Sequence, residues 1–156
     1  MQAKSNLTIR DIENVLDKCD ACYIGMVEEG GVPYVLPFNF GYHEGNLYLH
    51  AGPGGKKFDV LKQNNRVCAA FSTDHELRGR HENVACSFFM KYRSVLLHGY
   101  IEMIEDYDEK VKALNILMKK YTGRGDFKYN APAVKNVRTF RLVVENAEGR
   151  SFGYEK

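Results

Sequence analysis

Apolar and polar residues alternate over several short stretches of the chain, which is the period of a half-buried β-strand. These stretches cover residues 21–28, 32–42, 47–51, 66–72, 94–104 and 139–145, with a shorter one near 86–90. Turn residues separate the first of them, at Glu29-Gly30-Gly31 and His43-Glu44-Gly45-Asn46, and a polar loop passes through residues 78–82. The pattern therefore predicts an antiparallel meander that is mainly β-structure.

Other stretches have the period of an amphipathic helix. Thr8 can cap a first helix that should end near Asp20, and a short helix is expected over residues 56–63. A third helix, over residues 108–121, places Leu114, Leu117 and Tyr121 on one apolar face. We expect a loop over residues 122–132 and assign no element to residues 149–156. Many strands with a few short helices favour a β-barrel.

Composition limits the class of protein. The chain has 156 residues, 44% of them hydrophobic, which suits a single domain over residues 1–156 with a real core. No apolar run reaches the length that crosses a bilayer, so we expect a soluble protein without a membrane partner. Residues 1–6 lack the apolar centre of a secretory signal, which favours a cytoplasmic location and reduced cysteines. The formal net charge is +2 and no basic stripe alternates with aromatics, so nucleic acid is not expected to bind.

One junction has the character of a phosphate-binding site. The strand over residues 47–51 leads into Gly52-Pro53-Gly54-Gly55, and Lys56 and Lys57 then open a helix. Glycines let backbone N–H groups turn toward an anion, and the helix N-terminus and the lysines add positive charge. We therefore expect a phosphorylated ligand such as a mononucleotide. An ordinary connection with solvated lysines is the alternative.

The strand over residues 32–42 contains two prolines, which a central strand should not have. Pro37 in particular indicates an edge strand or a bulge, because proline cannot donate a hydrogen bond to a neighbouring strand. The backbone near Phe38, Asn39 and Phe40 could then meet a flat heterocycle. The alternative is an ordinary edge strand with no ligand.

A third feature lies where the strand over residues 94–104 begins. Arg93 offers a planar fork of donors and Ser94 a hydroxyl, and both groups suit a phosphate. Gly99, further along the same strand, would allow a close approach.

These features occur in a definite order. Pro33-Tyr34-Val35-Leu36-Pro37 is followed by Leu47-Tyr48-Leu49-His50, by residues 55–61, and by Tyr92-Arg93-Ser94-Val95 with Gly99. The series resembles the flavin-binding split-barrel proteins related to pyridoxamine-phosphate oxidase, and most closely their nitroimidazole-resistance, or nitroimidazole-reductase-like, branch. The resemblance implies a six-stranded antiparallel split β-barrel with short flanking helices. It also implies a homodimer that holds flavin mononucleotide (FMN) between its subunits.

The resemblance assigns cofactor contacts to nine residues: Pro37, Phe38, Asn39, Phe40, His50, Ala51, Lys57, Arg93 and Ser94. Residues 37–40 would line the isoalloxazine ring and Lys57 would meet the phosphate. Arg93 and Ser94 would approach the phosphate or the ribityl chain.

His50 matches a histidine that lies beside the flavin in this branch and is the one catalytic candidate. On the strand it shares a face with Tyr48, whereas Leu47, Leu49 and Ala51 form the better core face.

The implied activity is an FMN-dependent reductase that passes electrons from NADH or NADPH to a small acceptor, such as a nitroimidazole or a quinone. Pyridoxamine-phosphate oxidation is less favoured, because residues 151–156 lack the arginine-bearing segment with which those oxidases bind substrate. A non-catalytic flavin- or haem-binding module remains the alternative, with His50 and His98 available to haem.

Cys19 and Cys22 have the spacing of a zinc knuckle or a redox pair. Cys68 and Cys86 supply no second close pair, and a helix-to-strand junction explains the first. We therefore expect no metal site.

Overall fold

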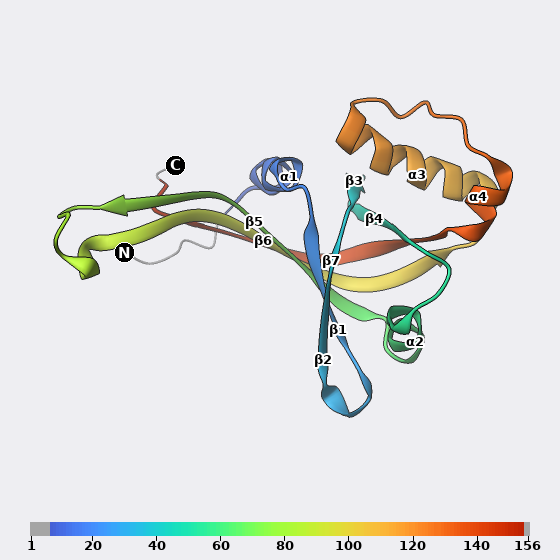
Figure 1. The fold of residues 1–156 in the computed structure, drawn as a ribbon, viewed down its shortest axis with the longest axis horizontal. Coiled ribbons are helices and arrows are strands. Elements are labelled where there is room, and N and C mark those ends of the chain that lie inside the picture. The colour runs from blue at the N-terminus through green and yellow to red at the C-terminus, as the bar shows by residue number, and fades with distance from the viewer. Residues whose placement is uncertain (1–6, 155–156) are drawn as a thin grey trace.

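A computed structural model describes residues 7–154; residues 1–6, on which the prediction of no secretory signal rests, and residues 155–156 lie outside the described part. Its centre is an antiparallel sheet of seven strands in the order β2-β1-β5-β6-β7-β4-β3 (Figure 1). The strands are β1 (Cys22–Val27), β2 (Pro33–Phe38), β3 (Gly41–His43), β4 (Asn46–Ala51), β5 (Arg66–Gly79), β6 (Phe88–Ile104) and β7 (Arg138–Phe152). Short 3₁₀ turns occupy Glu29–Gly31 and Ala85–Ser87.

The predicted mainly-β fold with flanking helices is confirmed, but the sheet stays open and has seven strands instead of six. It ends in β2 at one edge and β3 at the other, and within residues 7–154 no strand pairing joins these two edges. The stretch predicted as one strand over residues 32–42 divides into β2 and β3. Asn39 and Phe40 form the link between them, because the Phe40 N–H bonds to the Tyr121 hydroxyl instead of to a strand.

Three strands are longer than the sequence pattern predicted. β5 and β6 continue together well beyond the rest of the sheet, and β7 follows them, so that the three strands form a protruding arm (Figure 1). The segments predicted near 86–90 and 94–104 are one strand, β6. A bulge separates His98 from Gly99, where an added Cβ would collide with the carbonyl of Val143. The close approach that Gly99 permits is therefore made to β7.

The helices are α1 (Ile9–Lys18), α2 (Lys56–Gln63), α3 (Tyr107–Thr122) and α4 (Ala131–Asn136). Thr8 caps α1 as predicted, in a capping box with Asp11. Part of the predicted 122–132 loop belongs to α4, which Asn130 caps at its N-terminus. Within residues 7–154, no helix is long and apolar enough to cross a membrane.

The core lies between the inner face of the sheet and the helices α1 and α2. Leu47 and Leu49 are fully buried there, which confirms the face predicted for them, and Val60 and Leu61 join them from α2. Helix α3 packs on the other face of the β3–β4 hairpin, where Gly41 lets the Ile116 side chain and backbone come close. This arrangement leaves α2 beside the open part of the sheet (Figure 1).

Candidate functional site

A cleft of about 390 Å³ lies where the sheet fails to close. Residues from three elements line it: Leu36, Pro37, Phe38 and Asn39 at the end of β2, His50 and Ala51 at the end of β4, and Lys57 at the start of α2. Six of the nine residues that the resemblance assigned to the cofactor are therefore brought together. The volume is within the range of about 300–1,000 Å³ that small-molecule sites occupy.

Two strand edges with free backbone groups border this cleft. Among residues 7–154, β3 pairs with β4 only over residues 46–48, so residues 49–51 have a described neighbouring strand only on the β7 side. In the described part of the chain β2 pairs only with β1, which confirms the edge strand predicted from Pro37. Pro37 lacks an N–H and so cannot donate to a strand on either side, which suits its place in an edge strand. A flat heterocycle with donors and acceptors on its rim could bind between these edges.

Aromatic packing fixes the apolar wall of the cleft. The ring of Phe38 meets the ring of Phe140 nearly at a right angle, with centroids 5.9 Å apart. The ring of Phe140 also meets the ring of Phe58 in α2 nearly at a right angle, with centroids 5.8 Å apart. Edge-to-face contacts of this kind hold both partners in place. The cleft therefore has one rigid wall against which a planar ligand can lie.

His50 lies on the rim of the cleft and points away from the core. Partial burial of the imidazole lowers the pKa of His50 below its ordinary value of 6.5. The ring is therefore neutral at neutral pH, and one nitrogen can donate a hydrogen bond while the other accepts one.

The two lysines at the start of α2 have different surroundings. Lys56 Nζ lies 2.8 Å from a carboxylate oxygen of Glu28. Lys57 has no carboxylate partner within residues 7–154, lines the cleft, and carries its Nζ 5.2 Å from the Phe58 ring centroid. Gly55 precedes them with φ 121°, and a Cβ there would come 3.1 Å from Lys57 Nζ. Gly55 also has no side chain to cap α2, so the first N–H groups of the helix remain available to an anion.

Phe40 does not line the cleft, although the resemblance assigned it to the flavin ring. Its side chain is buried, with its ring 5.0 Å from that of Phe71 and 4.4 Å from the ammonium of Lys120. Asn39 is exposed and lines the cleft, whereas the Phe40 side chain is buried in the core.

Tyr121, at the end of α3, holds this link, and sequence reasoning missed that role. Its hydroxyl donates to the Asp20 carbonyl at 2.7 Å and accepts from the Phe40 N–H at 3.0 Å. The Asn39 side-chain amide donates to the same hydroxyl at 3.3 Å. The sequence showed Tyr121 only as part of an apolar helix face. Its contacts join segments about 80 or more residues apart, which a local pattern cannot reveal.

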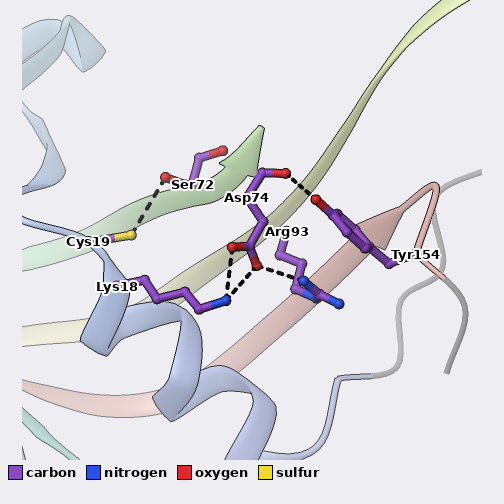
Figure 2. A network of polar contacts seen from close by, with 6 residues as sticks. All are labelled: Lys18, Cys19, Ser72, Asp74, Arg93 and Tyr154. Atoms are coloured by element: carbon purple, nitrogen blue, oxygen red, sulfur yellow. Dashed lines mark hydrogen bonds and ion pairs between the residues drawn. The ribbon is translucent and has the colours of Figure 1, made fainter. Parts of the chain in front are cut away.

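Arg93 and Ser94 lie on the arm and not at the cleft of their own chain. Figure 2 shows Arg93 between Asp74 and Tyr154: its guanidinium lies 2.6 Å from a carboxylate oxygen of Asp74 and 3.9 Å from the ring centroid of Tyr154. Lys18 binds the same carboxylate at 2.9 Å. Ser94 lies between β5 and β7, opposite Ser72 and Arg150.

Asp74 is the centre of this network. Its backbone has φ 56°, which is unusual for a residue with a side chain, at the bulge between Thr73 and Glu76. Partial burial alone would raise the pKa of its carboxyl, but hydrogen bonds from Lys18 and Arg93 outweigh it and hold the pKa below 3.8. The Tyr154 hydroxyl donates to the Asp74 carbonyl at 2.7 Å. The network therefore fastens α1 and the end of the chain to the arm.

The cysteines at the end of α1 are buried thiols. Cys19 Sγ donates to the Ser72 carbonyl at 3.6 Å, and burial raises the pKa of Cys22 to about 12. Both therefore stay protonated at neutral pH. Within residues 7–154, no three His, Cys, Asp or Glu side chains are grouped as they would be around a metal ion.

The sequence of the chain fits one known family. The family described as pyridoxamine 5′-phosphate oxidase matches residues 8–151, so the chain belongs to this family, as the sequence resemblance predicted.

Solved structures agree with this assignment. The crystal structure of a candidate 5-nitroimidazole antibiotic resistance protein from Bacteroides thetaiotaomicron is 39% identical in sequence, with a TM-score of 0.86 over 97% of this chain and 88% of that one. An FAD- and haem-binding protein from Mycobacterium smegmatis shares the fold at 19% identity, with a TM-score of 0.82 over 98% of this chain and 76% of its own. A flavocytochrome from Azotobacter vinelandii also shares the fold, at 21% identity and with a TM-score of 0.78 over 96% of this chain and 70% of its own. No curated protein matches the chain.

Proposed function

We propose that the cleft binds FMN and that the protein is a reductase, which takes electrons from NADH or NADPH and passes them to a small acceptor such as a nitroimidazole or a quinone. The observation that carries this proposal is the cleft itself, which two open strand edges border and in which Lys57, without a carboxylate partner among residues 7–154, lies at a helix start. The 39% identity to a candidate 5-nitroimidazole resistance protein supports a nitro compound as acceptor.

The residues of the cleft fit a flavin in their chemistry. Pro37 and Phe38 offer an apolar wall, and Asn39 and the backbone of residues 49–51 offer hydrogen-bonding groups at its sides. Lys57 and the first N–H groups of α2 would hold the phosphate. A bound flavin supplies transfer of a hydride or of single electrons between two substrates. His50, neutral at the rim, would orient the acceptor and donate a hydrogen bond to it.

We further propose that the protein is a homodimer. Exposed apolar side chains of β1 and β2 form one face: Tyr23, Val27 and Val35, with Tyr23 and Val35 each 57% exposed. Tyr23 lies directly opposite Pro37, so this face reaches the cleft. The arm exposes Leu77, Phe88 and Met90 as well. A second copy that covers these surfaces would remove them from water. It would also be the only means for Arg93 and Ser94 to reach a flavin, from the arm of the other subunit.

An absorption spectrum of the purified protein tests the proposal directly. Flavin bands, release of FMN on denaturation, and steady NADH or NADPH oxidation with an added nitro or quinone acceptor are the expected results. Flavin bands without turnover would favour a non-catalytic module, and a haem band would overturn the proposal. Light scattering should give a dimeric mass, and a monomer with full flavin content would contradict a cleft shared between subunits.

A further inference from the structure

A second cavity, of about 440 Å³, lies on the other side of the first turn of α2. We call it the α2 groove. It runs along the helix between α2 and the ends of β6 and β7, and its lining includes Phe58, Leu61, Lys62, Ile101, Met103 and Arg138. Ala51, which lines the cleft, is paired directly with Arg138. The cleft and the α2 groove therefore approach each other at the start of α2.

The inner part of the α2 groove is apolar. Leu61 and Ile101 are buried below it, and Phe58 and Met103 are half-buried at its sides. Phe58 is held by its edge-to-face contact with Phe140, so this surface is rigid. A flat aromatic base is the kind of group that such a surface accepts, because rings and thioethers pack well against it.

The outer part of the α2 groove is positively charged. The guanidinium carbon of Arg138 lies 5.0 Å from the Phe58 ring centroid, and Lys57 Nζ lies 5.2 Å from the same centroid. Neither cation has a carboxylate partner within residues 7–154, and Lys62 is exposed further along α2. Arg138 and Lys62 line the α2 groove itself, whereas Lys57 lies beside it at the Phe58 ring. One carboxylate, Asp59, also lines the groove and can accept hydrogen bonds from sugar hydroxyls. Two phosphates in series could contact Lys57 and Arg138 together.

We infer that the α2 groove binds the adenosine phosphate part of a dinucleotide, with the base against Phe58 and Met103 and the diphosphate between Lys57 and Arg138. The inference rests on the proposed function in one respect, which is that Lys57 marks the phosphate end of the flavin site. Two molecules carry this group. It is either the adenylate half of flavin adenine dinucleotide (FAD), continuous with the flavin in the cleft, or the adenylate half of the nicotinamide donor.

The first experiment uses ADP as the probe and does not depend on flavin. ADP is titrated into flavin-free protein while the Met103 methyl resonance, assigned through a Met103→Leu variant, is followed by NMR. We expect a saturable shift of this signal. Arg138→Ala should weaken ADP binding about tenfold, because it removes a charge-assisted contact, and Arg138→Lys should weaken it less. Arg10→Ala is the matched control: it removes an exposed arginine from α1 and should leave ADP binding unchanged.

A competition experiment then identifies the source of the adenylate. If the groove serves FAD, the ADP diphosphate occupies the place of the FMN phosphate, so ADP and FMN exclude each other and FAD binds more tightly than FMN. Arg138→Ala should then remove the advantage of FAD and leave FMN affinity within about twofold. If the groove serves the donor, ADP and FMN bind together, and Arg138→Ala raises the KM for NADH or NADPH in the FMN-loaded protein.

Absence of a Met103 shift at millimolar ADP, or equal ADP binding by the parent and Arg138→Ala, would overturn the inference even if FMN binds normally. If ADP binds as expected but the protein binds no flavin, the inference stands and the proposed flavin function fails. The two proposals can therefore be judged separately.

Discussion

The cleft and the arm each carry a cation that is suited to phosphate, and the two cations have opposite surroundings. Lys57, at the cleft, has no carboxylate partner within residues 7–154 and lies next to open strand edges. Arg93, on the arm, is bound to Asp74 at 2.6 Å and covered by the ring of Tyr154. An anion that approached Lys57 would gain an attraction, whereas one that approached Arg93 would have to replace a carboxylate.

This difference separates a binding role from a structural one. A cation that is already paired contributes to the stability of the fold, and a cation left unpaired at a cavity is available to a ligand. The same reasoning divides Lys56 from Lys57, since Lys56 is bound to Glu28. We make five predictions: the first three test whether this separation holds, and the last two concern the surroundings of the cleft.

The largest effect is expected for Lys57→Ala. A hydrogen bond to a charged group is worth roughly 1.5–3 kcal/mol, so the variant should bind FMN about ten- to a hundredfold more weakly. Riboflavin, which lacks the phosphate, should bind as it does to the parent, and calorimetric titration of both ligands measures the difference. Lys56→Ala is the matched control and should change FMN affinity much less. Unchanged FMN binding by Lys57→Ala would mean that the phosphate lies elsewhere.

For Arg93→Ala we expect a loss of stability. Removing the guanidinium leaves Asp74 with Lys18 alone and should lower the free energy of unfolding by about 1–3 kcal/mol in urea denaturation. FMN affinity should fall by less than it does in Lys57→Ala. A fall in FMN affinity as large as that of Lys57→Ala, with riboflavin unaffected, would instead place Arg93 at the phosphate of the other subunit.

Asp74→Asn extends this test to acid pH. The pKa of Asp74 is lower in the folded protein than its ordinary 3.8, so its contribution to stability is present above that pH and is lost as pH falls through the folded value. The parent should therefore lose stability below about pH 3.8 more steeply than the asparagine variant. If the free energy of unfolding falls with pH equally in the two proteins, the ion pairs of Asp74 contribute nothing to stability.

The fourth prediction concerns the link between β2 and β3, beside the cleft. Tyr121→Phe keeps the ring but removes the hydroxyl that binds the Phe40 N–H and the Asp20 carbonyl. We expect a loss of about 0.5–1.5 kcal/mol for a hydrogen bond of this kind, and faster hydrogen exchange at the Phe40 amide. Thr122→Val, which removes the neighbouring hydroxyl, is the control and should leave exchange at Phe40 unchanged. Equal exchange rates in Tyr121→Phe and the parent would contradict the role we give to this tyrosine.

The smallest effect is expected for His50→Gln. Flavin should remain bound, while acceptor turnover falls by well under the roughly hundredfold that loss of an essential general acid causes. Because the pKa of His50 lies below 6.5, the parent should change its turnover on the acid side of that pH, and the variant should lose this dependence. The same pH profile in both proteins, measured with nitro and quinone acceptors, would reduce His50 to a structural residue.

The sequence alone predicted one feature of the cleft that the structure confirms: Pro37 indicated an edge strand because proline cannot donate to a neighbour. The glycines before Lys57 led us to expect an anion there, which stays a prediction. These are local properties of the chain, so they can be read without a fold. The alternation of Leu47 and Leu49 likewise identified the buried face of β4.

Tertiary structure decided which of the expected groups meet. Arg93 and Lys57 are equally basic in the sequence, and only the positions of Asp74 and Tyr154 show that one of them is already engaged. The inward turn of Phe40 depends on Tyr121, 81 residues away, and the opening of the sheet depends on where β3 stops pairing with β4. Such contacts join segments remote in sequence. A periodic pattern shows only which face of a segment is buried and which is exposed to water, so the sequence determined where the helices and strands lie. The packing of the whole chain decided which groups surround each charged side chain.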